Sequence, residues 1–157
     1  MIMNKRKIYL FTSITVFIVL ISAGIFIKMN NAKNSIFITK KLDANENTYK
    51  KINDKVSQTI KENGVYLLNT GEDNVTYFIL DGSHISLKNE APYFSDIKIG
   101  NKGNSIIIYF NEELKIYPDI KYPEHRLIYK IIKDTNTEYI RVFKNGEETH
   151  FDSVICP

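Results

Sequence analysis

Three side chains near the C-terminus have the types and spacing that could support chemistry. Glu148, His150 and Asp152 alternate along the chain, and alternate residues of a β-strand share one face at intervals of about 7 Å. Two carboxylates and an imidazole on one face could hold a divalent metal ion or support general-base catalysis. The alternative is a solvated strand face, because Phe151 and Ile155 would point to the other side.

Other motifs of catalysis are missing from the sequence. His84 and His125 complete no HxH or HExxH spacing, and there is no GxSxG nucleophile motif and no GxGxxG phosphate-binding loop. The carboxylate pairs at 112–113 and 147–148 are adjacent, so on a strand their members point to opposite faces. These pairs favour solubilising charges, and the sequence predicts neither a cofactor nor a metal site beyond the weak candidates above.

Tyrosines beside prolines give a candidate site of another kind. Tyr93, Tyr117 and Tyr122 each stand next to a proline, in or near predicted loops. Tyrosine offers a large contact area at low conformational cost, so a surface of this kind is typical of protein-binding sites. The alternative is that these rings cap the open ends of a sheet.

The elements that must position these residues are mostly short strands. After residue 64 the hydrophobic pattern has a period of two and turn residues recur every roughly 8–12 residues, which predicts about eight strands. This pattern favours a mainly β (α+β) fold, a small antiparallel sandwich or barrel with one packing helix. The predicted strands are 65–69, 75–80, 84–87, 94–99, 105–111, 126–132, 138–144 and 147–155.

One amphipathic helix is predicted at 44–62. Asp43 and Glu46 have the spacing of a capping box, and Asn63-Gly64 supplies a stop signal. A single apolar stripe follows the helical period and should pack on the domain, with a coiled-coil dimer face as the alternative. The stripe consists of Tyr49, Ile52, Val56 and Ile60.

Two of the strands, 75–80 and 106–110, are apolar on both faces. We expect both to be central and covered on each side, with the helix covering one face. Asn145-Gly146 is the strongest hairpin signal in the chain, because both residues tolerate a positive φ. The connection 112–125 is the long loop of the predicted fold, and long loops on a rigid sheet often carry binding sites.

The N-terminal region contains an uncharged, mostly apolar run at 8–27. Its length suits a helix that crosses a bilayer, and Lys5-Arg6-Lys7 before it favours a cytoplasmic N-terminus. We therefore expect a cytoplasmic segment 1–7, a single-pass transmembrane anchor 8–28, a tether 29–42 and an extracytoplasmic domain 43–157. Within the tether, Ile36–Ile38 could form a strand or contact the membrane surface.

A cleaved signal peptide is the alternative for the same region. Ser22-Ala23-Gly24 could serve as the cleavage site, although the apolar run continues beyond it. Cleavage would release the domain as a secreted protein that binds a small ligand.

Charge and cysteine content restrict the classes of partner. Four of the 21 basic residues belong to the anchor and its flanks, and all 18 acidic residues follow residue 42, so the exterior portion has 17 − 18 = −1. This balance argues against a nucleic-acid partner. The lone Cys156 cannot form an internal disulfide. Frequent Ile, Lys and Asn suggest an AT-rich bacterial genome.

The strand pattern from Gly64 to Phe151 resembles small extracytoplasmic β-domains of Gram-positive bacteria, of the PrcB C-terminal type. The similar segments are the strand opening at 64–68, the segment 94–99 followed by 103–108, and Tyr122-Pro123 before the strand at 127–132. The sequence departs from that family at 81–84, where Asp-Gly-Ser-His replaces a glycine-rich turn. The resemblance implies a non-enzymatic partner of a protease.

Together these features predict a membrane-anchored domain that binds or regulates another envelope protein without catalysis. Two alternatives stay open. One is a hydrolase or metal-dependent enzyme that uses Glu148, His150 and Asp152, and the other is the secreted ligand-binding protein described above.

Overall fold

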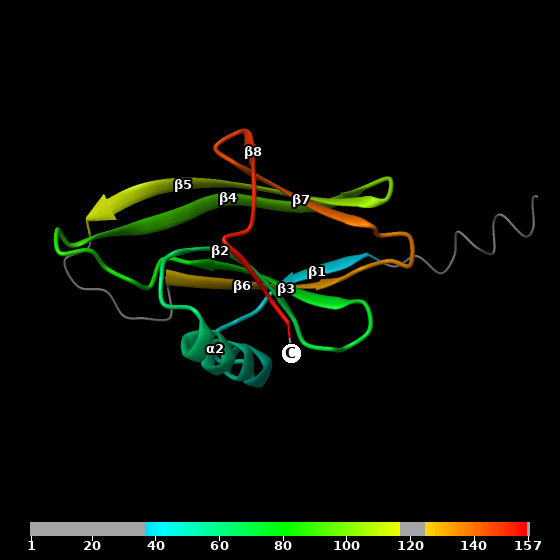
Figure 1. Cartoon of the computed structure of the whole chain (residues 1–157), viewed down its shortest axis with the longest axis horizontal. Coiled ribbons are helices and arrows are strands. Elements are labelled where there is room, and N and C mark those ends of the chain that lie inside the picture. The colour runs from blue at the N-terminus through cyan, green and yellow to red at the C-terminus, as the bar shows by residue number, and fades with distance from the viewer. Residues whose placement is uncertain (1–36, 117–124, 157) are drawn as a thin grey trace, which may run out of the picture. The chain divides into compact units, whose positions relative to one another are not determined.

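The computed structural model describes residues 37–116 and 125–156 of the chain. These residues form a pair of β-sheets that pack face to face, and one helix lies against the outer side of one of them (Figure 1). The fold is therefore mainly β, an α+β sandwich rather than a barrel.

The first sheet has five strands in the order β1-β6-β3-β2-β9. Neighbouring strands run antiparallel except β2 and β9, which are parallel. The strands are β1 (Ile38–Lys41), β2 (Gly64–Asn69), β3 (Val75–Asp81), β6 (Arg126–Ile132) and β9 (Ser153–Ile155).

The second sheet has four strands in the order β4-β5-β7-β8. β5 and β7 run parallel, because the chain leaves this sheet after β5, forms β6 in the five-stranded sheet and then returns. Both sheets are therefore mixed, and the prediction of a purely antiparallel fold was wrong. The strands are β4 (Glu90–Lys102), β5 (Ser105–Ile116), β7 (Tyr139–Lys144) and β8 (Glu147–Thr149).

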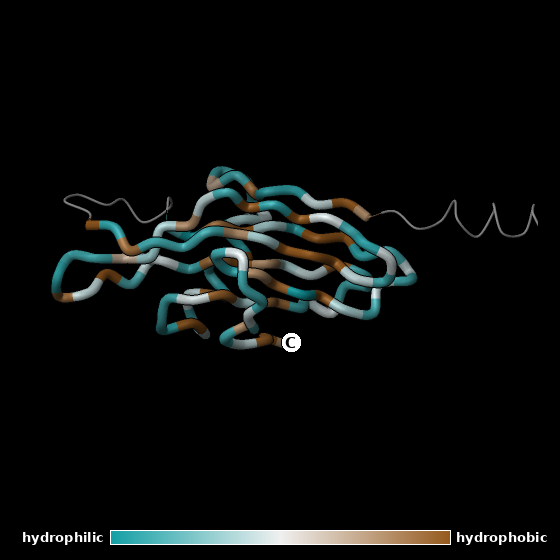
Figure 2. The backbone as a smooth tube through the Cα atoms, turned by 90° about the horizontal axis from the view of Figure 1, so that it is seen from above, coloured by the Kyte–Doolittle hydropathy of each residue, from teal (hydrophilic) through white to brown (hydrophobic). Residues whose placement is uncertain are grey.

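The main core lies between the two sheets. Alternate residues of each strand point inward, so both sheets contribute large apolar side chains that are withdrawn from water. Figure 2 shows hydrophobic stretches along the strands and hydrophilic residues at many of the turns. The fully buried members include Phe78 and Leu80 from one sheet and Ile106, Ile108 and Phe110 from the other.

The helix α2 (Asn47–Thr59) forms a second core on the outer face of the five-stranded sheet. The predicted stripe is confirmed: Tyr49, Ile52, Val56 and Ile60 are all buried there. The helix is shorter than the predicted 44–62. It begins later because the Asp43 carboxylate accepts a hydrogen bond from the Asn45 backbone N–H, which makes a turn, and it ends earlier because Ile60 adopts an extended conformation.

The C-terminal segment 147–155 departs from the prediction of one strand. It forms β8 in one sheet and β9 in the other, with a break at 150–152. Asp152 causes the change of sheet, since its N–H donates to the Val65 carbonyl and its carboxylate accepts from the Val65 N–H at 2.7 Å. The Asn145-Gly146 hairpin before β8 is confirmed, with φ of 53° and 88°.

The segment 84–87, predicted as a strand, is a loop. The side-chain amide of Asn63 binds both the N–H and the carbonyl of His84, so these backbone groups are not available to a strand partner.

At the N-terminal side, β1 lies inside the range predicted as a tether, so Ile38 belongs to a strand. The strand β5 continues to Ile116, so residues 112–116 of the predicted long loop 112–125 belong to a strand.

The predicted membrane anchor 8–28 lies outside the described residues, as do Tyr117 and Tyr122. Among the residues that the structure describes, no helix has the length and apolar character needed to span a membrane.

Candidate functional site

Glu148, His150 and Asp152 do not form the common face that their spacing predicted. Glu148 lies on β8 and binds Arg141 through two hydrogen bonds of 2.6 and 2.7 Å. Asp152 is held by the backbone of Val65, as described above, and His150 is exposed in the break between the strands. Two of the three side chains thus have structural partners in different regions of the sandwich.

Metal binding has no support among the described residues. Within 37–116 and 125–156, no group of three or more His, Cys, Asp or Glu side chains lies close enough together to hold a metal ion.

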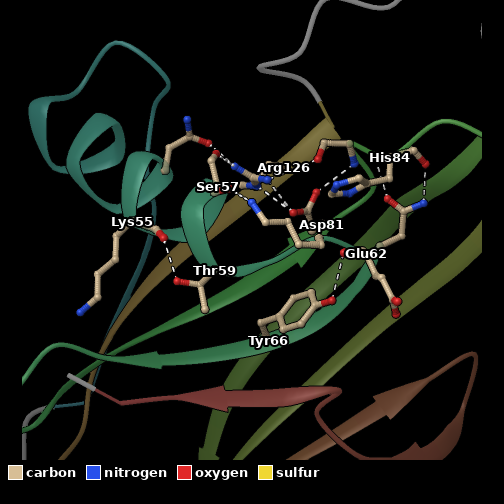
Figure 3. A network of polar contacts seen from close by, with 12 residues as sticks. Lys55, Ser57, Thr59, Glu62, Tyr66, Asp81, His84 and Arg126 are labelled. Carbon is tan, nitrogen blue, oxygen red and sulfur yellow. Dashed lines mark hydrogen bonds and ion pairs between the residues drawn. The ribbon is translucent and has the colours of Figure 1, made fainter.

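A buried ion pair joins the helix to the five-stranded sheet. Arg126 on β6 and Asp81 on β3 are 7% and 0% exposed, and the Arg126 Nη2 lies 2.7 Å from the Asp81 Oδ2. The Arg126 guanidinium also donates to the hydroxyl of Ser83 and to Asn53 and Ser57 on α2 (Figure 3). Each of its five N–H groups therefore has an acceptor.

This saturation makes Arg126 a structural residue rather than a ligand-binding one. A cavity of about 270 Å³ lies beside it between α2 and the sheet. The guanidinium has no remaining donor for a ligand in that cavity, and its charge is balanced by Asp81. The hydroxyl of Tyr49 donates to the Arg126 carbonyl, which ties the helix to β6 a second time.

The outer face of the four-stranded sheet is the better candidate. On β5, Ile106, Ile108 and Phe110 point into the sandwich, so Ile107 and Tyr109 point outward. No described element covers this side, and Tyr109 is 46% exposed. The expectation that this strand is covered on both faces was therefore wrong, whereas β3 is buried on both faces as predicted.

Register extends this face across three neighbouring strands. Ile107 pairs with Gly100 on β4 and with Arg141 on β7, and Tyr109 pairs with Lys98 and with Phe143. We call this surface the outer sheet face. It consists of Tyr93, Lys98, Gly100, Lys102, Ile107, Tyr109, Tyr139, Arg141 and Phe143.

Two aromatic rings and an arginine contact one another on the outer sheet face. The rings of Tyr109 and Phe143 stack with centroids 4.9 Å apart, and the Arg141 guanidinium lies 5.3 Å from the Phe143 centroid. The same guanidinium donates two hydrogen bonds to Glu148, and these lower the pKa of the Glu148 carboxyl. These contacts link side chains of β5, β7 and β8 on one surface.

Tyr93, one of the predicted binding residues, lies on the same face. It pairs with Glu113, which is two alternations along β5 from Tyr109, and it is 40% exposed. The ammonium group of Lys115 sits 3.6 Å from the centre of its ring. Tyr93 thus extends the aromatic surface toward the far end of β4.

A shallow groove of about 320 Å³ crosses the outer sheet face above Gly100. Lys98 and Lys102 lie on either side of Gly100 along β4, and Ile107 and Tyr109 form the opposite side. Neither lysine makes an ion pair with another described residue. The groove therefore combines an apolar wall with two unbalanced positive charges, which suits a segment that carries acidic and apolar side chains.

Sequence reasoning missed Tyr109, Tyr139 and Phe143. The signal was present, because 106–110 is apolar on both faces, but it was interpreted as a buried strand. Comparisons with protein-family models, with curated proteins and with solved structures found no match.

Proposed function

We propose that this chain is a membrane-tethered extracytoplasmic domain that binds another protein of the cell envelope through the outer sheet face, in a binding rather than a catalytic role. The observation that carries the proposal is the exposure of Tyr109 and Tyr139, 46% and 58%, on a sheet face that no described element covers. The uncharged run at 8–27 supports the tether.

The chemistry of the face favours a protein partner. Aromatic residues and arginine are enriched in protein–protein interfaces, where they give large contact areas at low entropic cost. The stacked pair Tyr109–Phe143 and the ion pair Arg141–Glu148 hold their side chains in place before binding. Such preorganisation reduces the conformational cost of association.

The lining of the groove above Gly100 indicates which kind of partner segment would bind there. Lys98 and Lys102 favour carboxylates, while Ile107 and Tyr109 favour apolar side chains. We therefore assign to the groove a segment of the partner that carries acidic and apolar residues. The resemblance to PrcB-type domains would make that partner a secreted or surface protease.

Photocrosslinking in the native cells tests this proposal. Benzoylphenylalanine replaces Tyr109 or Tyr139 in the full chain, and in a control it replaces Gln58, which is exposed on α2. We expect one discrete heavier adduct from each of the two outer-face positions and none from position 58. In addition, Tyr109→Ser should lower the yield of the adduct formed from position 139. If Tyr109 is a hot spot, its loss should weaken partner binding by at least about 30-fold.

Three results would contradict the proposal. One is the absence of any adduct from either outer-face position. Another is an adduct of equal yield from position 58. The third is an adduct with the mass of two copies of this chain, which would show that the face binds a second copy instead.

A further inference from the structure

A second, larger groove lies on the opposite side of the sandwich, between α2 and the five-stranded sheet. Its volume is about 530 Å³, and it is separate from both the outer sheet face and the cavity beside Arg126. Its lining includes Lys51 and Lys55 from α2, Lys130 from β6 and Glu72 from the loop before β3.

The three lysines of this groove have no structural role that the structure reveals. None of Lys51, Lys55 and Lys130 makes an ion pair with another described residue. Lys51 and Lys55 are four residues apart on one helix, where like charges destabilise the helix. Three ammonium groups and the carboxylate of Glu72 leave the lining with a charge of 3 − 1 = +2.

The carboxylates of Glu46 and Asp81 are engaged by other basic residues. Lys40 is the cross-strand partner of Lys130, and Lys40 already binds the nearby Glu46 at 2.9 Å. Lys55 points away from the Arg126 network, so it does not share the charge of Asp81 (Figure 3).

The rest of the lining suits a ligand with both polar and apolar groups. The Thr70 hydroxyl is buried and has no hydrogen-bond partner among the described residues. Tyr77 and Ile52 provide an apolar floor. Burial, with a smaller contribution from the charge of Glu72, raises the pKa of the Tyr77 hydroxyl, so Tyr77 adds no negative charge at neutral pH.

The groove lies toward the end of the sheet where the chain enters the described domain. β1 begins at Ile38, which pairs with Ile132, and Ile132 in turn pairs with Val75. The loop that carries Thr70 and Glu72 leads directly into Val75. If the anchor ends at residue 28, the ten residues from 29 to Ile38 allow a separation of at most about 36 Å between the anchor and this end of the sheet.

We propose that this groove binds the phosphate group of an anionic lipid headgroup. Lysine ammonium groups are common phosphate ligands, and an anionic membrane surface attracts clusters of them. Binding here would fix the orientation of the domain over the bilayer. The assignment to a lipid rests on the anchor of the proposed function, whereas the outer sheet face plays no role in it.

Nuclear magnetic resonance of the full chain in lipid nanodiscs tests the proposal. The discs contain phosphatidylcholine alone or phosphatidylcholine mixed with phosphatidylglycerol, and the readout is the backbone amide signals of Thr70 and Tyr77. Inorganic phosphate is titrated into the phosphatidylcholine discs as the soluble source, against sodium chloride at equal ionic strength. Retention of the chain in the discs is measured separately by size exclusion.

The variant with Lys51→Gln, Lys55→Gln and Lys130→Gln should lose the response. A matched control with Lys41→Gln, Lys61→Gln and Lys88→Gln makes the same change of charge at exposed sites outside both grooves. Each groove lysine should contribute about fivefold to the apparent affinity, so the first variant should bind about 100-fold more weakly. Unchanged signals from the remaining residues confirm that both variants are folded.

We expect phosphatidylglycerol to shift both amide signals in the wild type and in the control, and inorganic phosphate to shift the same signals more weakly in the phosphatidylcholine discs. Shifts with inorganic phosphate but not with phosphatidylglycerol would overturn the lipid assignment, as would a chain that does not stay in the discs. Equal shifts in the groove variant would overturn the site itself. Loss of the outer-face crosslinks would leave these results unchanged, so failure of partner binding can be told apart.

Discussion

The two sheets of the sandwich carry similar outward side chains but differ in what covers them. On β3, Tyr77 and Ile79 point outward under α2 and are 3% and 0% exposed. On β5, Tyr109 and Ile107 also point outward, and Tyr109 is 46% exposed. One pair belongs to a core, and the other pair forms an open surface.

This difference separates stability from binding within a single domain. Buried contacts, including the Arg126–Asp81 pair, stabilise the helix-covered side. Substitutions there should act mainly on the stability of the fold. The outer sheet face has only exposed ion pairs such as Arg141–Glu148, each of which contributes little to folding. Substitutions on this face should act mainly on the affinity for the partner.

The largest expected effect comes from the buried ion pair. Arg126→Met leaves the Asp81 carboxylate buried without its partner, and we expect a loss of about 3–5 kcal/mol in the free energy of unfolding. The exposed counterpart Arg141→Met should cost less than about 1 kcal/mol. Chemical denaturation of the full chain in detergent measures both. Equal losses of unfolding free energy in the two variants would contradict the difference between the helix-covered side and the outer sheet face.

The next effect compares two isoleucines. Ile79→Ala opens a cavity beneath α2 and should cost about 2–5 kcal/mol. Ile107→Ala on the outer sheet face should cost less than about 1 kcal/mol, because water already reaches that side chain. The same denaturation experiment tests this pair, and a larger loss for Ile107→Ala would show that the outer face is covered.

Much of the architecture could be predicted from the sequence, and the misses have physical causes. The strand 126–132 and the stripe on α2 were predicted correctly, because each depends on local periodicity. The prediction of one strand at 147–155 was wrong, because a contact between Asp152 and the distant backbone of Val65 moves the chain to the other sheet. The prediction that β5 is covered on both faces was also wrong. Periodicity does not reveal which of the two sheets the packing helix covers.

The candidate site was only partly predictable. Tyr93 was identified from its neighbouring proline, and it lies on the outer sheet face. Tyr109 and Phe143 belong to different strands, and their stacking depends on the parallel pairing of β5 with β7. No local motif signals a parallel pair formed after a chain crosses between sheets.

Alkaline pH should affect the helix-covered side through its tyrosines. Burial raises the pKa of Tyr49, Tyr66 and Tyr77, so the unfolded chain ionises first. Their contribution to stability is complete below about pH 10 and is lost as the pH rises through the folded-state pKa values. Denaturation across this range should show falling stability. Tyr77→Phe should make the fall shallower, and an unchanged slope would contradict this cause.

The smallest effect on stability should come from Gly100. A Cβ built at this position meets no atom within 4 Å, and the backbone needs no left-handed conformation there. Gly100→Val should therefore leave the free energy of unfolding equal or raise it by up to about 1 kcal/mol. It would nevertheless place a branched side chain in the groove between Lys98 and Lys102.

The most direct test of the outer sheet face combines Gly100→Val with the photocrosslinker at position 139, and Thr39→Val on β1 serves as the matched control. Partner binding through the groove predicts a folded Gly100→Val chain that has lost the crosslink, while the Thr39→Val chain keeps it. An undiminished crosslink in the Gly100→Val chain, at equal amounts of folded protein, would contradict the account.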